Sequence, residues 1–521
     1  MAKRFNTTGS CNPDRHYMVN IDDKLAKIEE LVNEGLYFTI NRARQFGKTT
    51  TMNFLYNRLQ SEYLMIQISF EGVGESLYAN ETSFCDTFKK MVARIMELSS
   101  KEDSLRWNTL PTPTSLDELS LMISNFCRES NKPVVVLIDE VDKSTDNQLF
   151  LNFLGMLRNK YLDRDKNGMD STFHSVILAG VYDVKNLKLK IRSDEERKYN
   201  SPWNIAVRFN VDMTLSAEGI KGMLDEYESD YHTGMDTKLI ADEIRRLTSG
   251  YPVLVSYLCS LTHEELEGDW TIEGINKAAK YIIKGDNTLA DDISKNLGNN
   301  TELKKFMYAI SVNGEFFNYN LTNATLKVAD MFSYIKNEDG HVVIHNAIFE
   351  EIFHEYFTID YQIANSGKVS VTKSEYILGG KLNMEYIIER FKDLMEEEYR
   401  DEDAEFVERQ GRLLFLCFLK PIINGTGYYY VEPQTRDNKR MDIVVNYAGE
   451  EFLIELKLWY GHKYEQKGEI QVSEYANVRG LKKAYLITFS FLKEKVVQVE
   501  PEWKTVNGVD VYEGIIWARR R

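Results

Sequence analysis

The sequence has few cysteines, no long apolar run and no excess of positive charge. Its five cysteines lie far apart and form no Cys-x-x-Cys pair, which fits free thiols in a reducing cytosol and excludes a disulfide framework and a zinc or haem motif. No stretch approaches the roughly 18 apolar residues that cross a bilayer, and the N-terminal residues include no apolar signal region. We therefore expect a soluble, cytoplasmic protein with no membrane partner.

The formal net charge is −16, which argues against charge-driven coating of nucleic acid. A local basic channel would still allow DNA to bind. At 521 residues the chain exceeds what one hydrophobic core organises, so we expect about two to four domains. We find no internal repeat and no low-complexity tract.

The clearest motif lies between residues 37 and 54. An apolar strand, Tyr37–Ile40, leads into a turn that contains Gly47, Lys48 and Thr49, and a helix-compatible run follows. Backbone N–H groups of such a loop, together with the helix N-terminus, can bind phosphates. Lys48 can reach the terminal phosphates, and the Thr49 hydroxyl can ligate Mg²⁺. The motif therefore predicts a phosphate-binding loop for ATP and Mg²⁺.

Two neighbouring positions qualify this motif. Thr50 follows the motif and is included among the expected nucleotide contacts. Position 42, where the pattern G-x-x-x-x-G-K-[ST] has its first glycine, is Arg42. This departure leaves open whether ATP is hydrolysed or only sensed. The alternative is a chance Gly-Lys-Thr at a strand–helix junction.

A second signal comes from five consecutive apolar residues, Val134 to Ile138, which predict a strand buried on both faces of a parallel sheet. The strand ends in Asp139 and Glu140, at the edge where an open α/β sheet binds its ligand. Asp139 can hold Mg²⁺, and Glu140 can polarise the attacking water. Buried strands that end in acids are common, and it is the combination with the upstream Gly-Lys-Thr that makes this one specific.

Other stretches complete an α/β core. Apolar patterns predict strands over 63–70 and 174–181 and a strand within 201–215 that closes the sheet, and helices over 22–33, 82–98 and 116–129. Tyr17, just before the first helix, has two interpretations. It either stacks on the adenine base or belongs to the core.

Residues 216–284 are helical in pattern, with a break at Gly250-Tyr251-Pro252. The segments NRARQFGKTT, VVVLIDE, SPWN and SGYPVLVSYL together resemble the AAA-like, signal-transduction and Orc-like type of P-loop ATPase over roughly residues 1–290. This resemblance implies an ATPase core at 1–215 and a helical lid at 216–295, in which Pro252 contacts the nucleotide.

Residues 301–357 have the pattern of a helix, a short helix, a hairpin around Asn337–Gly340 and a last helix. The order resembles the winged helix that follows the lid in such ATPases, here at 296–365. No basic recognition helix is visible, so we favour a clamp between domains over a DNA-binding role. Residues 366–380 are polar and rich in small residues, as expected of a linker.

The remaining residues, 381–521, carry a second set of chemical groups. Two strands, Met441–Val445 and Phe452–Leu458, flank a turn at Ala448-Gly449. A hairpin that turns there places Asp442 opposite Glu455, with their Cβ atoms about 5 Å apart. Period-2 alternation puts Lys457 on the face of Glu455. Asp442 and Glu455 can together bind Mg²⁺, while Lys457 orients the water that attacks a phosphodiester.

This D…ExK arrangement resembles the PD-(D/E)XK nuclease superfamily, whose domain is a restriction-endonuclease-like α/β fold. The resemblance implies that a helix acid completes the metal site, with Glu408 as the first choice and Glu405 the second, and that Gln471 is the glutamine of the following helix. It also implies Mn²⁺ as an alternative to Mg²⁺. The competing interpretation is a solvated surface ladder of Glu455 and Lys457.

Both halves together resemble a bacterial group of AAA-like ATPases with this nuclease at the C-terminus. The leading hypothesis is an ATP-regulated, Mg²⁺-dependent DNA endonuclease, with defence against foreign DNA as a compatible role. The first alternative is a nucleotide-dependent sensor or scaffold whose nuclease fold binds DNA without cutting it. The second is an accessory ATPase of transposition or DNA repair. A homo-oligomer and a partner protein are both left open.

Overall fold

The computed structural model describes residues 3–141, 147–166, 170–181, 203, 205–207, 209–285, 287–312, 315–364, 376–398, 408–423, 427–430, 443–458, 462–490 and 502–517. The chain divides into two compact units, Met1–Ile282 with Ala329–Tyr334 and Ile283–Val328 with Ile335–Arg521. All five cysteines are free, as the sequence predicts. Within the described ranges, no helix combines the length and apolar character that a membrane crossing requires.

The first unit contains the predicted parallel sheet. Its four strands among the described residues lie in the order β1-β4-β3-β2, and every neighbouring pair is parallel. They are β1 (Phe38–Asn41), β2 (Leu64–Ser69), β3 (Val134–Asp139) and β4 (Ser175–Gly180). Every residue of β3 and β4 is buried, which explains their unbroken apolar sequences.

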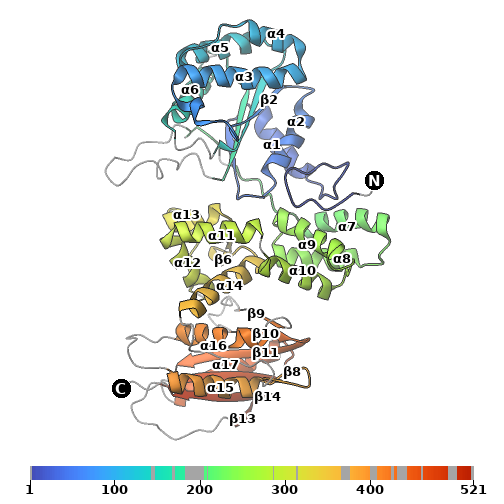
Figure 1. Cartoon of the computed structure of the whole chain (residues 1–521), viewed down its shortest axis with the longest axis vertical. Coiled ribbons are helices and arrows are strands. Elements are labelled where there is room, and N and C mark those ends of the chain that lie inside the picture. Colours follow the sequence, from blue (N-terminus) through green and yellow to red (C-terminus); the bar gives the residue numbers. More distant parts are fainter. Residues whose placement is uncertain are drawn as a thin grey trace, which may run out of the picture. The chain divides into compact units, whose positions relative to one another are not determined.

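Six helices accompany these strands in the described part of the core: α1 (Asp22–Asn33), α2 (Lys48–Leu59), α3 (Glu81–Ser99), α4 (Lys101–Thr109), α5 (Leu116–Glu129) and α6 (Gln148–Asp165). Figure 1 labels the helices α1 to α6 and β2 of the sheet in the same unit. A short 3₁₀ helix, η1 (Glu75–Tyr78), precedes α3. The predicted helices over 22–33 and 116–129 have the observed bounds, and the one over 82–98 is α3. Neither α4 nor α6 was predicted.

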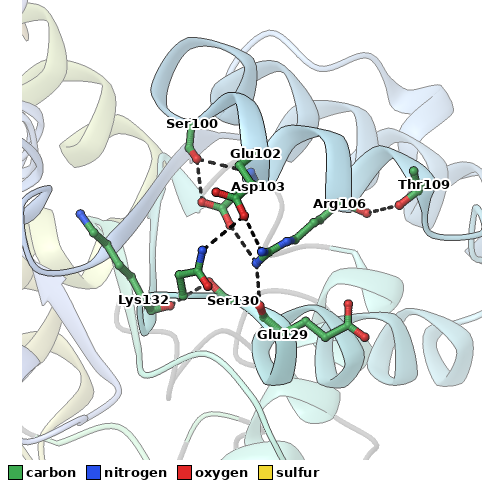
Figure 2. A network of polar contacts seen from close by, with 9 residues as sticks. Ser100, Glu102, Asp103, Arg106, Thr109, Glu129, Ser130 and Lys132 are labelled. Atoms are coloured by element: carbon green, nitrogen blue, oxygen red, sulfur yellow. Dashed lines mark hydrogen bonds and ion pairs between the residues drawn. The ribbon is translucent and has the colours of Figure 1, made fainter.

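Polar contacts hold α4 in place (Figure 2). The Ser100 side chain caps its first turn, and Arg106 donates to Glu102 Oε1 at 2.5 Å and to the Glu129 carbonyl oxygen at 2.6 Å. The second bond joins α4 to the end of α5. Trp107 of α4 is fully buried and donates to the Lys89 carbonyl at 2.9 Å. A single buried aromatic side chain and these bonds define a helix that is otherwise mostly polar.

The strand expected within 201–215 is wrong for the residues of that stretch that the structure describes. They make one isolated parallel bridge, between Phe38 and Val207. Their large apolar side chains pack as separate groups instead: Trp203 stacks on Tyr37 and Phe209 on Phe38. Burial of these rings over β1 replaces the extended pairing that the apolar pattern suggested.

The helical region that follows contains α7 (Ala217–Tyr231), α8 (Thr237–Thr248), α9 (Pro252–Glu264) and α10 (Ile272–Lys284). Between α8 and α9, the N–H of Leu215 donates to the Gly250 carbonyl at 2.8 Å. Gly250 has φ +72°, and a Cβ there would lie 2.1 Å from the Leu215 oxygen. Only glycine fits this crossing of two backbone segments.

We expect Gly250→Ala to lower the free energy of unfolding of this unit by about 3 kcal/mol or more, because the new methyl group meets backbone atoms in a left-handed conformation. Urea denaturation followed by circular dichroism measures the change. Gly222→Ala is the matched control: it lies in α7 with no heavy atom within 4 Å of the added Cβ, and should stabilise slightly. Equal unfolding midpoints for the two variants would contradict the expected crowding.

The second unit begins with an all-helical stretch and a small hairpin. Its elements are α11 (Thr288–Asn299), α12 (Thr301–Ser311), α13 (Ala324–Met331), β5 (Ile335–Glu338), β6 (His341–Ile344) and α14 (Ala347–Ala364), and α13 crosses the boundary of the two units. β5 and β6 pair antiparallel. The expected order of helix, short helix, hairpin and helix is therefore present, and the last helix extends beyond residue 357.

The C-terminal part of this unit is a six-stranded mixed sheet in the order β13-β14-β12-β11-β10-β9. The strands are β9 (Gly427–Tyr430), β10 (Ile443–Tyr447), β11 (Glu450–Leu458), β12 (Lys483–Ser490), β13 (Glu502–Val506) and β14 (Val509–Trp517). Helices α15 (Met384–Glu398) and α16 (Glu408–Ile423) share one apolar core with the sheet, while α17 (His462–Val478) packs into a second core on its other face.

The expected linker over 366–380 is partly wrong. Its residues 366–375 lie outside the described residues, but Tyr376 is buried in the core shared by α15 and α16. The next residues form β7 (Ile377–Leu378), which pairs with β8 (Lys381–Leu382). Gly379 and Gly380 both have positive φ and make the turn. The glycine pair thus marks a hairpin of the folded body.

Candidate functional site

The stretch from Asn41 to Gly47 joins β1 to α2 in a tight loop. Gln45 has φ +59° and Gly47 has φ +80°, so the chain turns twice through the left-handed region before α2 begins at Lys48. The first-turn N–H groups of α2 therefore face the loop, which is the arrangement that binds anions at a helix N-terminus. The predicted strand, turn and helix are all present.

Lys48 is buried at the base of this loop. Its side chain is 9% exposed, and its Nζ donates to the carbonyl oxygens of Arg42 and Ala43, each at 3.0 Å. The loop thus wraps around the ammonium group. A positive charge held in this position can make charge-assisted hydrogen bonds to phosphate oxygens.

Thr49 and Asp139 meet across the carboxyl edge of the sheet. The Thr49 hydroxyl donates to Asp139 Oδ2 at 2.9 Å, and Asp139 is 5% exposed at the end of β3. A hydroxyl and a carboxylate so placed fit the hard-oxygen preference of Mg²⁺, which in nucleotide sites uses one or two protein ligands together with phosphates. The two metal ligands predicted from sequence are therefore adjacent in the structure.

Glu140 follows Asp139 in a strained backbone conformation. Its φ is +53°, and its N–H donates to Asp139 Oδ1 at 2.9 Å. Such non-glycine residues cost about 1–3 kcal/mol and cluster at functional sites. A cleft of about 490 Å³ is lined by Thr49, Asp139 and Glu140, and also by Tyr56, Gln67, Ile68, Ser69, Glu71, Ile95 and Leu98. Thr49, near the start of α2, and the two acids thus open onto one cavity.

The helical region α7–α10, predicted to be the lid, contacts the loop directly. The Tyr251 hydroxyl donates to the Arg44 carbonyl at 2.7 Å, and the rings of Tyr251 and Phe46 lie edge to face with centroids 4.7 Å apart. Pro252 occupies the first turn of α9, as predicted from the Gly-x-Pro break. It is Tyr251, which sequence reasoning did not select, whose side chain reaches the loop.

Tyr17 belongs to the core, the second of its two interpretations. It is 2% exposed, its ring packs on Phe5 and Tyr227, and its hydroxyl donates to Asp230 Oδ2 at 2.7 Å. Burial, followed by the hydrogen bond to Asp230, raises the pKa of this hydroxyl and keeps it a donor. Stacking on adenine is therefore not supported, because the ring is already enclosed by the N-terminal segment and α7.

Thr50 is also engaged within the protein. Its hydroxyl oxygen accepts a hydrogen bond from the Cys11 N–H at 3.1 Å. The side chain thus anchors the N-terminal segment on α2. Its expected contact with the nucleotide stays a prediction.

The hairpin of the C-terminal sheet has the predicted register. Ile443 pairs with Ile454 and Val444 with Leu453, and the turn is made by Ala448 and Gly449, both with positive φ. Asp442 lies outside the described residues, one position before β10 begins. The register predicted from the turn is confirmed for Ile443 to Tyr447, and the pairing of Asp442 with Glu455 stays a prediction.

Glu455 and Lys457 lie on the same face of β11, as predicted. Lys457 Nζ is 2.6 Å from Glu455 Oε1. Glu455 is only 1% exposed and Lys457 has a 28% exposed side chain. The interpretation as a solvated ladder is therefore wrong for Glu455, because α17 and its core cover this face of the sheet. Burial of a charged carboxylate beside a lysine costs desolvation free energy, which a hydrogen-bond network or a functional role has to compensate.

The two helix residues lie on opposite sides of this sheet. Gln471 is part of α17, and Gly468 of the same helix approaches Lys457, since a Cβ there would lie 3.5 Å from Lys457 Cγ. Glu408 is the first residue of α16, which packs on the other face. The structure therefore places Gln471 on the helix over Glu455 and Lys457. The side chain of Glu408 and all of Glu405 lie outside what the structure describes, so both assignments stay predictions.

A second charged cluster lies beside this pair and was missed from sequence. Glu513, which is 3% exposed on β14, is 3.0 Å from Lys504 Nζ and accepts from the Thr488 hydroxyl at 3.3 Å. Lys504 also binds Glu469 of α17 at 2.9 Å. Since these residues come from β12, β13, β14 and α17, no local pattern could have indicated the cluster. It fixes α17 on the sheet.

A phosphate-binding type of loop between a parallel strand and a helix, with acids at the end of a neighbouring strand, is the arrangement found in P-loop proteins. The chain belongs to the AAA-like domain family, whose model matches residues 9–355, more than half of its length. A search of curated proteins finds no match.

The chain is similar to several solved structures at low identity and with TM-scores below 0.5. The Walker-type ATPase of Pyrococcus abyssi is 14% identical, with 67% of this chain and 99% of that chain covered and a TM-score of 0.46. The ORC2 protein of Aeropyrum pernix, in ADPNP–ADP complexes, is 12% identical (69% and 97% covered, TM-score 0.36). Cdc6p of Pyrobaculum aerophilum is 14% identical (67% and 97% covered, TM-score 0.33).

Proposed function

We propose that the first unit binds and hydrolyses ATP and that this cycle regulates a Mg²⁺-dependent DNA endonuclease in the C-terminal part of the chain. The observation that carries the ATP site is the convergence of Lys48, Thr49 and Asp139 at the carboxyl edge of the parallel sheet. Lys48 and the first-turn amides of α2 would bind the β- and γ-phosphates. Thr49 and Asp139 would hold Mg²⁺, which neutralises charge on the phosphates.

Glu140 would polarise the attacking water. We expect Glu140→Gln to bind ATP as tightly as the wild type and to hydrolyse it at least about a hundredfold more slowly, because the amide cannot accept a proton while Asp139 remains a metal ligand. Release of inorganic phosphate measures the rate. Glu71→Gln, at the side of the same cleft, is the matched control and should keep the wild-type rate. Hydrolysis by Glu140→Gln at the wild-type rate would remove Glu140 from the mechanism.

The nuclease proposal is supported by the pairing of Glu455 with Lys457 on a covered sheet face and by the hairpin register that extends towards Asp442. Asp442 and Glu455 would hold Mg²⁺ or Mn²⁺, with Glu408 as an additional acid, and the metal would activate water towards a phosphodiester. Lys457 would orient that water, and Gln471 would help to position the DNA strand. A PD-(D/E)XK type of domain at 381–521 is the corresponding fold proposal.

Residues 296–365 would serve as a winged helix that clamps the nuclease domain. Packing of α14 near α16 supports this role: Lys420 of α16 is 2.6 Å from Glu355 of α14, and the His354 ring lies edge to face with Tyr429 of β9. Both contacts lie within the second unit. The helix that begins at Glu408 would thereby be connected to α14.

The proposal is tested by incubating the full chain with supercoiled, linear and single-stranded DNA, with and without ATP and with Mg²⁺ or Mn²⁺. Metal-dependent cleavage that changes with ATP is the expected result. Binding of DNA without cleavage under every condition would instead favour the nucleotide-dependent sensor, because burial of Glu455 beside Lys457 also fits a neutralised, non-catalytic site.

A further inference from the structure

Arg42, at the position of the missing loop glycine, is directed towards the segment that enters the lid. Its Nη2 donates to the Val211 carbonyl at 2.7 Å, and its guanidinium lies 5.3 Å from the centre of the Phe209 ring. A second hydrogen bond runs from Nη1 to the Asn41 carbonyl at 2.8 Å. A glycine at position 42 could make none of these side-chain contacts.

These contacts are the first in a series that connects the loop to the lid and then returns to the loop. From Val211 the chain continues to Leu215, whose N–H donates to the Gly250 carbonyl at 2.8 Å. The next residue, Tyr251, returns to the loop through its hydrogen bond to the Arg44 carbonyl at 2.7 Å and its ring contact with Phe46. The loop is therefore held at residue 42 by the segment that leads into the lid, and at residues 44 and 46 by Tyr251 of the lid.

The N-terminal segment adds an independent connection between the same two parts. The Cys11 N–H donates to the Thr50 hydroxyl on α2, and the Tyr17 hydroxyl donates to Asp230 on α7. Lys3 forms an ion pair with Glu226 of α7 at 2.5 Å. The beginning of α2 is thus connected to the lid on its other side.

We propose that Arg42 and Tyr251 are positioning residues that fasten the phosphate loop to the lid, so that bound nucleotide leaves only when both contacts break. This inference rests on the proposed ATP site. It gives Arg42 a function. In place of a flexible glycine, the loop has a side chain whose contacts couple the position of the lid to the phosphate-binding turn. The lid then controls how fast bound nucleotide is released, and with it whether the protein is in its nucleotide-bound state.

The test is the release rate of a fluorescent ADP from the full chain, measured by stopped-flow displacement with excess unlabelled ADP. Tyr251→Phe removes only the hydroxyl and keeps the ring on Phe46, and it should release ADP about fivefold faster. Arg42→Ala should release it at least about tenfold faster, because a charge-assisted hydrogen bond is lost. Arg42→Lys, which keeps the charge and one donor, should give an intermediate rate.

Tyr281→Phe is the control, since Tyr281 is a 56% exposed tyrosine on α10 of the lid, and its release rate should equal that of the wild type. Melting temperatures of all variants are measured alongside. Wild-type release rates in Tyr251→Phe and Arg42→Ala, whatever their melting temperatures, would overturn the inference and leave the ATP site intact. Failure of the wild-type protein to bind ADP or ATP would overturn the ATP site and the inference together.

Discussion

Replacing Lys48 by alanine is expected to weaken binding of Mg²⁺ and ATP by about a hundredfold or more. Lys48 is the cation enclosed by the loop, where it is 9% exposed and held by the carbonyls of Arg42 and Ala43. Without it, the terminal phosphates would face these carbonyl oxygens with no positive side chain between them. Equilibrium dialysis with labelled ATP measures the affinity.

Lys27→Ala is the matched control for this change. Lys27 is an exposed lysine of α1 in the same unit, so its removal alters the net charge equally and leaves the loop untouched. It should bind ATP like the wild type. Equal affinities for Lys48→Ala and the wild type would contradict the assignment of the loop.

The second large effect is expected at the hairpin. Glu455→Gln should reduce DNA cleavage by about a thousandfold, because the proposed metal ligand is lost while the shape of the side chain is kept. The fold should survive, since the change neutralises a carboxylate that is 1% exposed and leaves a lysine that still reaches solvent. Conversion of supercoiled plasmid to nicked and linear forms measures the rate.

Glu450→Gln on the same strand is the control, because Glu450 is an exposed glutamate beside the turn. It should cut DNA at the wild-type rate. Lys457→Ala should keep metal-induced thermal stabilisation and lose most of the cleavage rate. If Glu455→Gln cuts like the wild type, Glu455 is not a metal ligand and the second site has no catalytic function.

The local sequence pattern was sufficient to predict much of the fold. The apolar residues of α1 and α5 recur at helical spacing, and both helices have the predicted bounds. The unbroken apolar run of β3 predicted a strand buried on both faces. The register of β10 and β11 followed from one turn, because a two-residue hairpin turn with positive φ at both positions fixes every pair beyond it.

Prediction from the sequence failed where the local structure depends on contacts with residues that are distant along the chain. Helix α4 is mostly polar, and its position depends on Trp107 and on bonds to α5. Phe209 and Trp203 looked like strand residues, but they pack over β1 as single rings. In each case a buried aromatic side chain, positioned by another part of the chain, decides the local conformation.

The candidate sites show the same division. Lys48, Thr49 and Asp139 were predicted because motif and strand position bring them together at one edge of the sheet. The contacts of Arg42 with Val211 and of Tyr251 with Arg44 join residues more than 150 positions apart, so no spacing indicated them. The sequence identified the groups that we propose carry the chemistry, and the structure identified those that hold the loop.

Hydrogen–deuterium exchange of the full chain, with and without Mg²⁺ and ATP, tests the central claim most directly, because it reports both that nucleotide binds and where. The account predicts slower exchange in peptides that cover residues 41–52 and 137–140, the loop with the start of α2 and the end of β3. Unchanged exchange in both peptides at saturating ATP would contradict the nucleotide site.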